Sequence, residues 1–107
     1  MRRGDVVTIA MSGAYGKPRP ALIIQADAFD AIPSVTVLPL TSEVHPEDLV
    51  RITLQPTPQN GLRAVSQVMI DQAVTTPRSK VGEVIGRVDD DALRAVGAAL
   101  SRFLGLS

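Results

Sequence analysis

Apolar residues along this chain alternate with polar ones or run continuously over short stretches, a pattern typical of β-strands. Turn-forming residues separate these stretches, most clearly in "QPTPQNG" at 55–61. Pro39 predicts an edge or a bulge in its strand, because proline has no N–H to donate to a ladder. We expect strands at 5–10, 19–26, 35–40, 49–54, 62–75 and 82–88, of which 62–75 is the longest.

The period of the pattern changes after residue 88, and the segment 89–106 predicts one amphipathic helix. Asp89 suits the N-cap of this helix and Gly105 suits its end. With a single long helix, the pattern favours a mainly β fold with a C-terminal α-helix, a small, partly open β-barrel, over a ferredoxin-like fold. The length predicts one domain, 1–107. Apolar residues recur at helical spacing at Leu93, Val96, Leu100 and Leu104.

Composition restricts the chemistry that is open to the chain. Eleven basic and eleven acidic side chains cancel, so any phosphate site must be a local arrangement of a few cations. The absence of cysteine excludes a disulfide framework. The single histidine, His45, excludes a multi-histidine zinc site within one chain. We expect no cofactor. The N-terminus lacks the apolar core of a signal peptide, and no run approaches the ~20 apolar residues of a membrane span. We therefore expect a soluble, cytoplasmic protein.

The stretch "GKPRPALIIQ" (16–25) places Arg19 between two prolines, directly before a continuously apolar run. Proline fixes its own φ and restricts the preceding residue to extended conformations. Pro20 therefore favours β geometry at Arg19, where the strand begins. A cation held in this way at the mouth of a sheet is a candidate group for binding an anion.

Five segments, taken together and in order, resemble toxins of the MazF/PemK type from bacterial type II toxin–antitoxin systems. The resemblance implies an SH3-like barrel shared with the CcdB toxins, a homodimer and a cognate antitoxin. It also implies sequence-specific, metal-independent cleavage of single-stranded RNA. The segments are "RGDVV" (3–7), "GKPRPALIIQ" (16–25), "VLPLTS" (37–42), "NGLRAVSQVMIDQ" (60–72) and "VGEVIGRVDDDALRAVGAALSRFLGL" (81–106).

The resemblance also implies which residues are catalytic. In the family, the arginine of a Gly-x-x-Arg-Pro motif and the threonine after a Pro-x-Thr strand end carry the chemistry. The corresponding residues here are Arg19 and Thr41, with Ser42 beside the threonine. Some members add an arginine two residues before an aspartate. This chain keeps the aspartate, Asp71, but has Met69 in place of that arginine.

The missing arginine leaves two alternatives: either Arg19 and Thr41 suffice, or another cation such as Arg63 or Lys17 substitutes. A guanidinium can donate two hydrogen bonds to phosphate oxygens, and the hydroxyl of Thr41 or Ser42 can donate a further one. The expected products of attack by the 2′-OH are a 2′,3′-cyclic phosphate and a 5′-OH end. Arginine is a poor base.

Two residues compete for the role of general base. Asp71 supplies an available carboxylate, and His45 has a side chain suited to proton transfer near neutral pH. The sequence does not decide between them.

Contacts with RNA are expected from a small set of side chains. Single-stranded RNA is commonly held by aromatic stacking and by cations. Tyr15, in a loop beside Lys17, is the best stacking candidate among few aromatic residues. The expected RNA contacts are Tyr15, Lys17, Arg63 and Gln67.

Two alternatives to an endoribonuclease are a CcdB-like toxin that inhibits gyrase and an SH3-like binding module without catalysis. The resemblance places a tryptophan near the C-terminal end of gyrase inhibitors, and this chain has none. Binding modules of this fold usually offer several aromatic residues, whereas this chain has only Tyr15, Phe29 and Phe103. Both observations favour the RNA-cleaving alternative.

Overall fold

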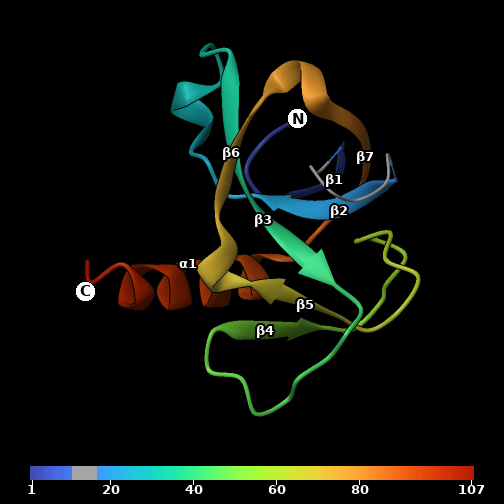
Figure 1. Cartoon of the computed structure of the whole chain (residues 1–107), viewed down its shortest axis with the longest axis vertical. Helices are drawn as coiled ribbons and strands as arrows, with labels where there is room; N and C mark the ends of the chain where they lie inside the picture. Colours follow the sequence, from blue (N-terminus) through green and yellow to red (C-terminus); the bar gives the residue numbers. More distant parts are fainter. Residues whose placement is uncertain (11–16) are drawn as a thin grey trace.

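The computed structural model describes residues 1–10 and 17–107, which form seven strands, three short 3₁₀ turns and one α-helix (Figure 1). The strands are β1 (Asp5–Ala10), β2 (Pro18–Ile23), β3 (Ser34–Thr41), β4 (Arg51–Leu54), β5 (Ser66–Met69), β6 (Val74–Pro77) and β7 (Val81–Arg87). The helical elements are η1 (Asp27–Phe29), η2 (Ile70–Gln72), η3 (Arg78–Lys80) and α1 (Asp90–Phe103).

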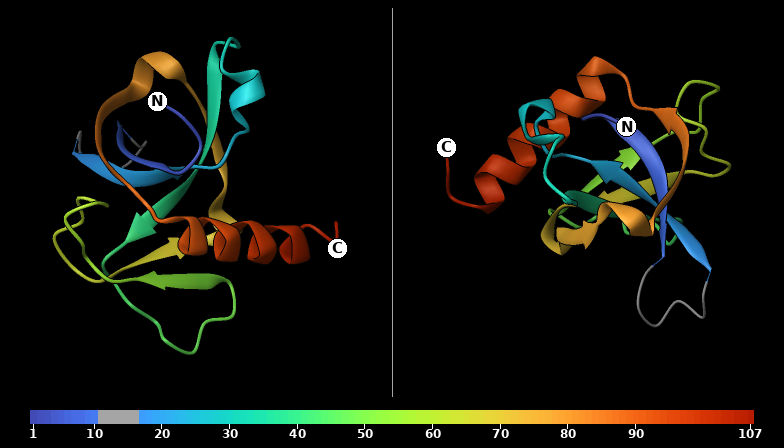
Figure 2. Two further views of the ribbon diagram at one scale, coloured as in Figure 1. Left: turned by 180° about the vertical axis from the view of Figure 1, so that it is seen from behind. Right: turned by 90° about the horizontal axis from the view of Figure 1, so that it is seen from above.

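All pairings in the sheet are antiparallel, and the strand order is β4-β5-β3-β2-β1-β7, with β6 pairing a second part of β3. The sheet curls around the core without closing, because β4 and β7 each pair on one side only. α1 lies against this sheet, and its C-terminal end projects beyond the strands (Figure 2). The predicted fold, a mainly β partly open barrel with a C-terminal helix, is confirmed. No helix in the described part of the chain is long and apolar enough to cross a membrane.

β3 is a central strand, so Pro39 does not mark an edge, which was one of the two alternatives predicted for it. On one side β3 pairs with β2, where Pro39 faces Ala21. On the other side the partner changes, from β6 up to Val37 to β5 from Leu40 onward (Figure 1). Pro39 falls between these two ladders, where no residue is paired with it on that side. Its missing N–H therefore removes no ladder bond there.

The single long strand expected at 62–75 is also wrong, because β5 and β6 are separated by η2. The chain has to move from one half of β3 to the other, and the 3₁₀ turn makes this step. Ile70 holds the turn in place: its side chain is buried in the core, and its N–H donates to the carbonyl of Val50 at 2.9 Å. The alternation of apolar residues continues through Ile70, which is why the sequence suggests an unbroken strand.

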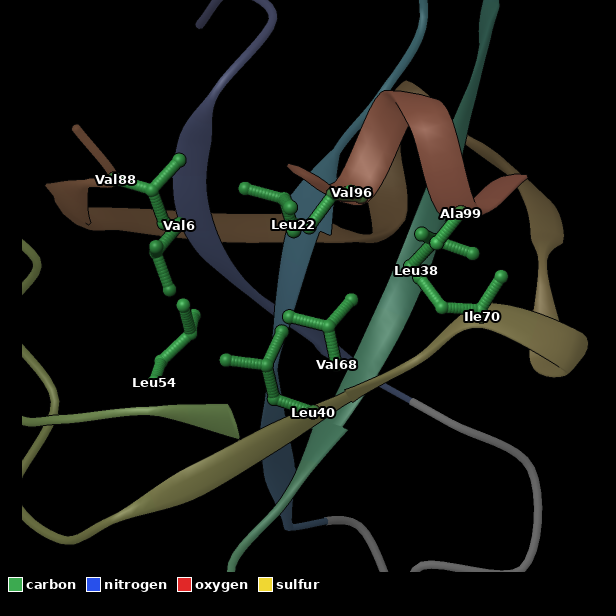
Figure 3. Packing of buried hydrophobic residues seen from close by; sticks show 10 residues of the cluster. All are labelled: Val6, Leu22, Leu38, Leu40, Leu54, Val68, Ile70, Val88, Val96 and Ala99. Atoms are coloured by element: carbon green, nitrogen blue, oxygen red, sulfur yellow. The ribbon is translucent and has the colours of Figure 1, made fainter. Parts of the chain in front are cut away.

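The core consists of two clusters on opposite faces of shared strands. The larger cluster lies beneath α1 (Figure 3) and the smaller on the other face, so Val6 and Val7 of β1 point to different clusters. Of the predicted helix stripe, Val96 is fully buried, whereas Leu104 is 56% exposed. The larger cluster comprises Val6, Leu22, Leu38, Leu40, Leu54, Val68, Ile70, Val88, Val96 and Ala99.

Both predicted ends of α1 are confirmed. The side chain of Asp89 accepts a hydrogen bond from the N–H of Ala92 at 2.7 Å, as an N-cap does. At the other end Gly105 adopts a φ of 74°, and the N–H of Leu106 donates to the carbonyl of Ser101 at 2.8 Å. This reversed hydrogen bond after a left-handed glycine is a Schellman motif, which ends the helix.

The connection at 55–61 is held tightly against β7. Asn60 Oδ1 accepts from the N–H groups of Thr57 and Leu62, each at 3.0 Å. A Cβ atom on Gly86 would lie 2.2 Å from the carbonyl carbon of Asn60, so only glycine permits this approach. The tight packing fixes the start of the 61–64 segment, which borders the candidate site.

Candidate functional site

A hollow of about 460 Å³ lies where β2 begins and β3 ends. β2 and β3 are antiparallel neighbours, so the start of one and the end of the other meet at the same rim. Thr41 in turn pairs with Gln67 of β5, which brings a third strand to the hollow. The hollow is lined by Arg19, Pro20, Pro39, Leu40, Thr41, Ser42, Glu43, Ser66 and Met69.

Arg19, Thr41 and Ser42, predicted from the sequence to be catalytic, thus line one hollow. Arg19 is the one cation among the described residues that line it, and its side chain is exposed. Thr41 Oγ1 accepts a hydrogen bond from the N–H of Glu43 at 3.1 Å. A hydroxyl that accepts from the main chain still has its own proton to donate, so Thr41 can donate to an anion beside Arg19.

Gln67 has a different place from the one expected for an RNA contact. It is 1% exposed, and its amide binds the main chain of the loop after β3: the N–H of His45 donates to Oε1 at 2.9 Å, and Nε2 donates to the carbonyl of His45 at 3.2 Å. Nε2 also lies 3.1 Å from Thr53 Oγ1 of β4. Gln67 therefore anchors the 42–45 segment and does not present its amide at the surface.

The two candidate bases are placed differently. Asp71 is exposed in η2, outside the residues that line the Arg19 hollow, and its Oδ2 accepts from Gln72 Nε2 at 3.1 Å. Met69, which stands where some family members have arginine, does line the hollow. His45 is 45% exposed and lies outside it, with Nε2 3.7 Å from Glu43 Oε1. The structure of this chain brings neither candidate base to the rim occupied by Arg19.

A second hollow of about 760 Å³ adjoins the first. It shares Pro20, Ser42 and Ser66 with the first hollow and extends past Arg63 to Glu83 of β7. Together the two hollows form a groove with Arg19 in one half and Arg63 in the other. We call this the Arg19–Arg63 groove. Lys17 is exposed directly before β2, and Tyr15 lies outside the described residues.

Sequence analysis missed Glu43, which follows Thr41 by two residues and lines the hollow with it. The signal available was its position in "LTSE", immediately after a predicted strand end, but an acidic residue in a polar loop is usually only solvated. Among the described residues, no three His, Cys, Asp or Glu side chains gather in a way that could hold a metal ion.

Residues 2–104 match the model of the PemK-like, MazF-like toxins of type II toxin–antitoxin systems. The chain belongs to this family. The resemblance predicted from the five segments is thereby confirmed, and the Gly-x-x-Arg-Pro arginine and the Thr41 strand end of a MazF-like toxin lie in one hollow.

Relatives of this MazF-like chain are similar along their whole length. One is 49% identical over 108 residues, covering 100% of this chain and 99% of its own: the probable endoribonuclease MazF of Mycolicibacterium smegmatis. A mycobacterial endoribonuclease solved in complex with its cognate antitoxin has a TM-score of 0.84 at 22% identity, covering 100% and 97% of the two chains. A MazE–MazF crystal structure from Deinococcus radiodurans has a TM-score of 0.80 at 25% identity, covering 100% and 97%.

Proposed function

We propose that this protein is an endoribonuclease toxin that cleaves single-stranded RNA at short sequence motifs without a metal ion. The observation that carries the proposal is the presence of Arg19 and Thr41 in one hollow at the ends of adjacent strands, in a chain of the MazF-like family. The 49% identical relative bears the name of a probable endoribonuclease, which supports the same activity here.

The proposed reaction is attack of a ribose 2′-oxygen on the adjacent phosphorus, with release of the 5′-oxygen. Negative charge grows on the phosphate oxygens during this step. Arg19 donates two hydrogen bonds to these oxygens, and the Thr41 hydroxyl donates a third. Ser42 lines the same hollow and holds the neighbouring phosphate or ribose. Donors aimed at developing charge in this way typically contribute roughly 10²–10³ in rate each.

The RNA is proposed to lie along the Arg19–Arg63 groove. Lys17, exposed directly before β2, and Arg63, which lines the second hollow, provide further cations, and Arg63 supplies part of the positive charge of the arginine that Met69 replaces. Tyr15 is proposed to stack on a base, because any of the four bases can stack on an aromatic ring. Motif recognition then depends on the shape of the groove rather than on bulk charge, which is zero for this chain.

A cognate antitoxin is the proposed regulator. Two similar structures are complexes, one with a cognate antitoxin and one of MazE with MazF. We propose that a flexible acidic and apolar segment of the antitoxin covers the Arg19 hollow, with a carboxylate at the arginine where RNA would place its phosphate.

Because the proposed substrate is RNA, the protein is proposed to act in the cytoplasm.

A homodimer is proposed as the active form, with the loops 11–18 and 41–48 bordering an RNA groove at the subunit interface. A shared groove concentrates the few cations of a neutral chain. Apolar side chains left uncovered in the described single chain support a partner: Phe103, Leu104 and Leu106 at the end of α1 are 50%, 56% and 76% exposed. Light scattering at micromolar concentration is expected to give the mass of two chains, whereas a fully active monomer contradicts this arrangement.

The deciding experiment is incubation of the pure protein with a mixed-sequence single-stranded RNA in the presence of EDTA. We expect cleavage to persist, because the proposed chemistry uses side chains only. The downstream fragments should carry 5′-hydroxyl ends, which polynucleotide kinase labels directly without phosphatase. A requirement for Mg²⁺, or fragments that the kinase cannot label, would refute this mechanism.

A further inference from the structure

One carboxylate shares the hollow with Arg19 and Thr41. Glu43 lines it, and among the described residues of that lining it is the one with a carboxylate group. Asp71, the carboxylate expected from the sequence, lies outside the hollow and accepts a hydrogen bond from Gln72. The residue that the reaction still lacks, a proton acceptor beside the phosphate-binding arginine, is thus available at position 43.

The main chain of Glu43 is fixed on both sides. Its N–H donates to Thr41 Oγ1 at 3.1 Å, and two residues later the N–H and the carbonyl of His45 are both bound by the buried amide of Gln67. The side chain itself is 82% exposed. A carboxylate on a fixed backbone can reach a substrate hydroxyl while it exchanges protons freely with water.

We propose that Glu43 is the general base that accepts the 2′-hydroxyl proton. This assignment rests on the proposed endoribonuclease function. Arg19 and Thr41 can only donate hydrogen bonds to the phosphate at working pH, so neither can remove the proton. Glu43 lies at the same rim of the hollow, and its carboxylate removes the proton.

The proposed step balances without a co-reactant. The 2′-O–H bond breaks as Glu43 takes the proton, the 2′-oxygen bonds to phosphorus, and the bond from phosphorus to the 5′-oxygen breaks. The 5′-oxygen takes a proton from water, and the protonated Glu43 returns one to water. The net result is transfer of one proton from the 2′-oxygen to the 5′-oxygen, with a cyclic phosphate and a 5′-hydroxyl as products.

The loop provides a matched control for Glu43. Glu43 Oε1 lies 3.7 Å from Nε2 of His45, and Glu47 Oε1 lies 3.9 Å from Nδ1 of the same ring. The two side chains are 82% and 79% exposed, and only Glu43 lines the hollow. Glu43 shares the hollow with Arg19 and lies near His45 in the loop, and Glu47→Gln leaves both of these residues in place while it removes one carboxylate, as Glu43→Gln does.

The first test compares Glu43→Gln with Glu47→Gln at saturating single-stranded RNA. We expect Glu43→Gln to lower kcat by roughly 10²-fold or more, with KM almost unchanged, and Glu47→Gln to cleave like the wild type. A fully 2′-O-methylated copy of the same RNA, which cannot be cleaved, should bind both variants with wild-type affinity.

The second test is chemical rescue of Glu43→Ala with formate, a small carboxylate that can occupy the space left by the side chain. Formate should raise the cleavage rate of Glu43→Ala and leave Glu47→Ala unchanged. A Glu43→Gln protein that cleaves like the wild type overturns the assignment of Glu43 as the general base and leaves the proposed function standing. Failure of formate to accelerate Glu43→Ala also overturns it, whereas a wild-type protein that cleaves no RNA overturns the proposed function itself.

Discussion

The side-chain amide of Gln67 binds both main-chain polar groups of His45, accepting from its N–H at 2.9 Å and donating to its carbonyl at 3.2 Å. One buried side chain thereby makes the two main-chain hydrogen bonds that a neighbouring strand makes in a β-ladder. Because Thr41 and Glu43 precede His45 by only four and two residues, their positions at the hollow depend on this amide. Catalysis is expected to be sensitive to Gln67 although the side chain does not reach the surface.

Gln67→Met should separate this positioning role from RNA binding. Methionine keeps the length of the side chain but cannot bind the main chain of His45, so the N–H and the carbonyl of His45 lose their partner. We expect a loss of about 1–3 kcal/mol in the free energy of unfolding and a lower kcat, with the affinity for 2′-O-methylated RNA retained. Gln72→Met is the matched control, since Gln72 is exposed and its amide donates to the neighbouring Asp71. Wild-type kcat in Gln67→Met would contradict the positioning role.

Arg19→Lys should lower the cleavage rate by roughly 10² or more and leave most RNA binding intact. Lysine keeps the charge, but its ammonium is a point cation that cannot bridge two phosphate oxygens in the way a guanidinium does. The control is Arg94→Lys, because Arg94 is an exposed helix residue paired with Asp91. Single-turnover kinetics measure the effect, and near-normal cleavage by Arg19→Lys refutes the proposed role.

Cleavage is expected to depend on the hydroxyl of Thr41 and not on the size of its side chain. Thr41→Val keeps the shape but removes the donor to the phosphate and the acceptor for the Glu43 N–H, so kcat should fall by roughly 10²–10³. Thr41→Ser keeps both hydrogen bonds and should retain most activity. Thr75→Val removes an exposed hydroxyl of β6 that bonds to Thr36, and serves as the control. Equal activity in Thr41→Val and Thr41→Ser would contradict a catalytic hydroxyl.

Inhibition by the antitoxin should be competitive with RNA. If an antitoxin carboxylate and the RNA phosphate bind the same Arg19, raising the RNA concentration must raise the antitoxin concentration needed for half-inhibition. The measurement is cleavage at several RNA concentrations in the presence of the cognate antitoxin that we propose. Half-inhibition that does not change with RNA concentration would exclude overlap at Arg19.

Gly86→Ala should destabilise the fold through the packing of the 55–61 connection. The added Cβ would lie 2.2 Å from the carbonyl carbon of Asn60 and 2.6 Å from the carbonyl oxygen of Gln59, and main-chain atoms there cannot move aside. We expect a loss of about 1–3 kcal/mol or more by denaturant unfolding. Gly105→Ala is the control: a Cβ there meets no atom within 4 Å, so only the positive φ contributes, about 1 kcal/mol.

Local rules read from the sequence predicted several features correctly. The β-branched run 5–10 forms β1 with the predicted bounds, and Asp89 caps α1, because both depend on interactions within a few residues. Arg19 and Thr41 were found through motifs, and the structure places them at one rim. Their roles stay predictions until cleavage is measured.

Features that depend on distant partners could not be predicted. The break at Ile70 follows from the change of partner along β3, and the apolar alternation gives no sign of it. Gln67 is predicted from the sequence as an RNA contact, whereas its burial depends on a loop residue that precedes it by 22 residues. Sequence analysis missed Glu43, because only the pairing of β2 with β3 brings it to the same hollow as Arg19.

A MazF-like toxin is synthesised from its N-terminus to its C-terminus, so its site residues leave the ribosome at different times. Arg19, Thr41 and Glu43 emerge early during synthesis, but the hollow is completed by Met69, and the larger core cluster is closed by Val96 of α1. A nascent chain therefore carries the side chains proposed for catalysis before the hollow that holds them is complete. The endoribonuclease that we propose would in this way stay inactive while it is being translated, and would become active only after α1 has docked.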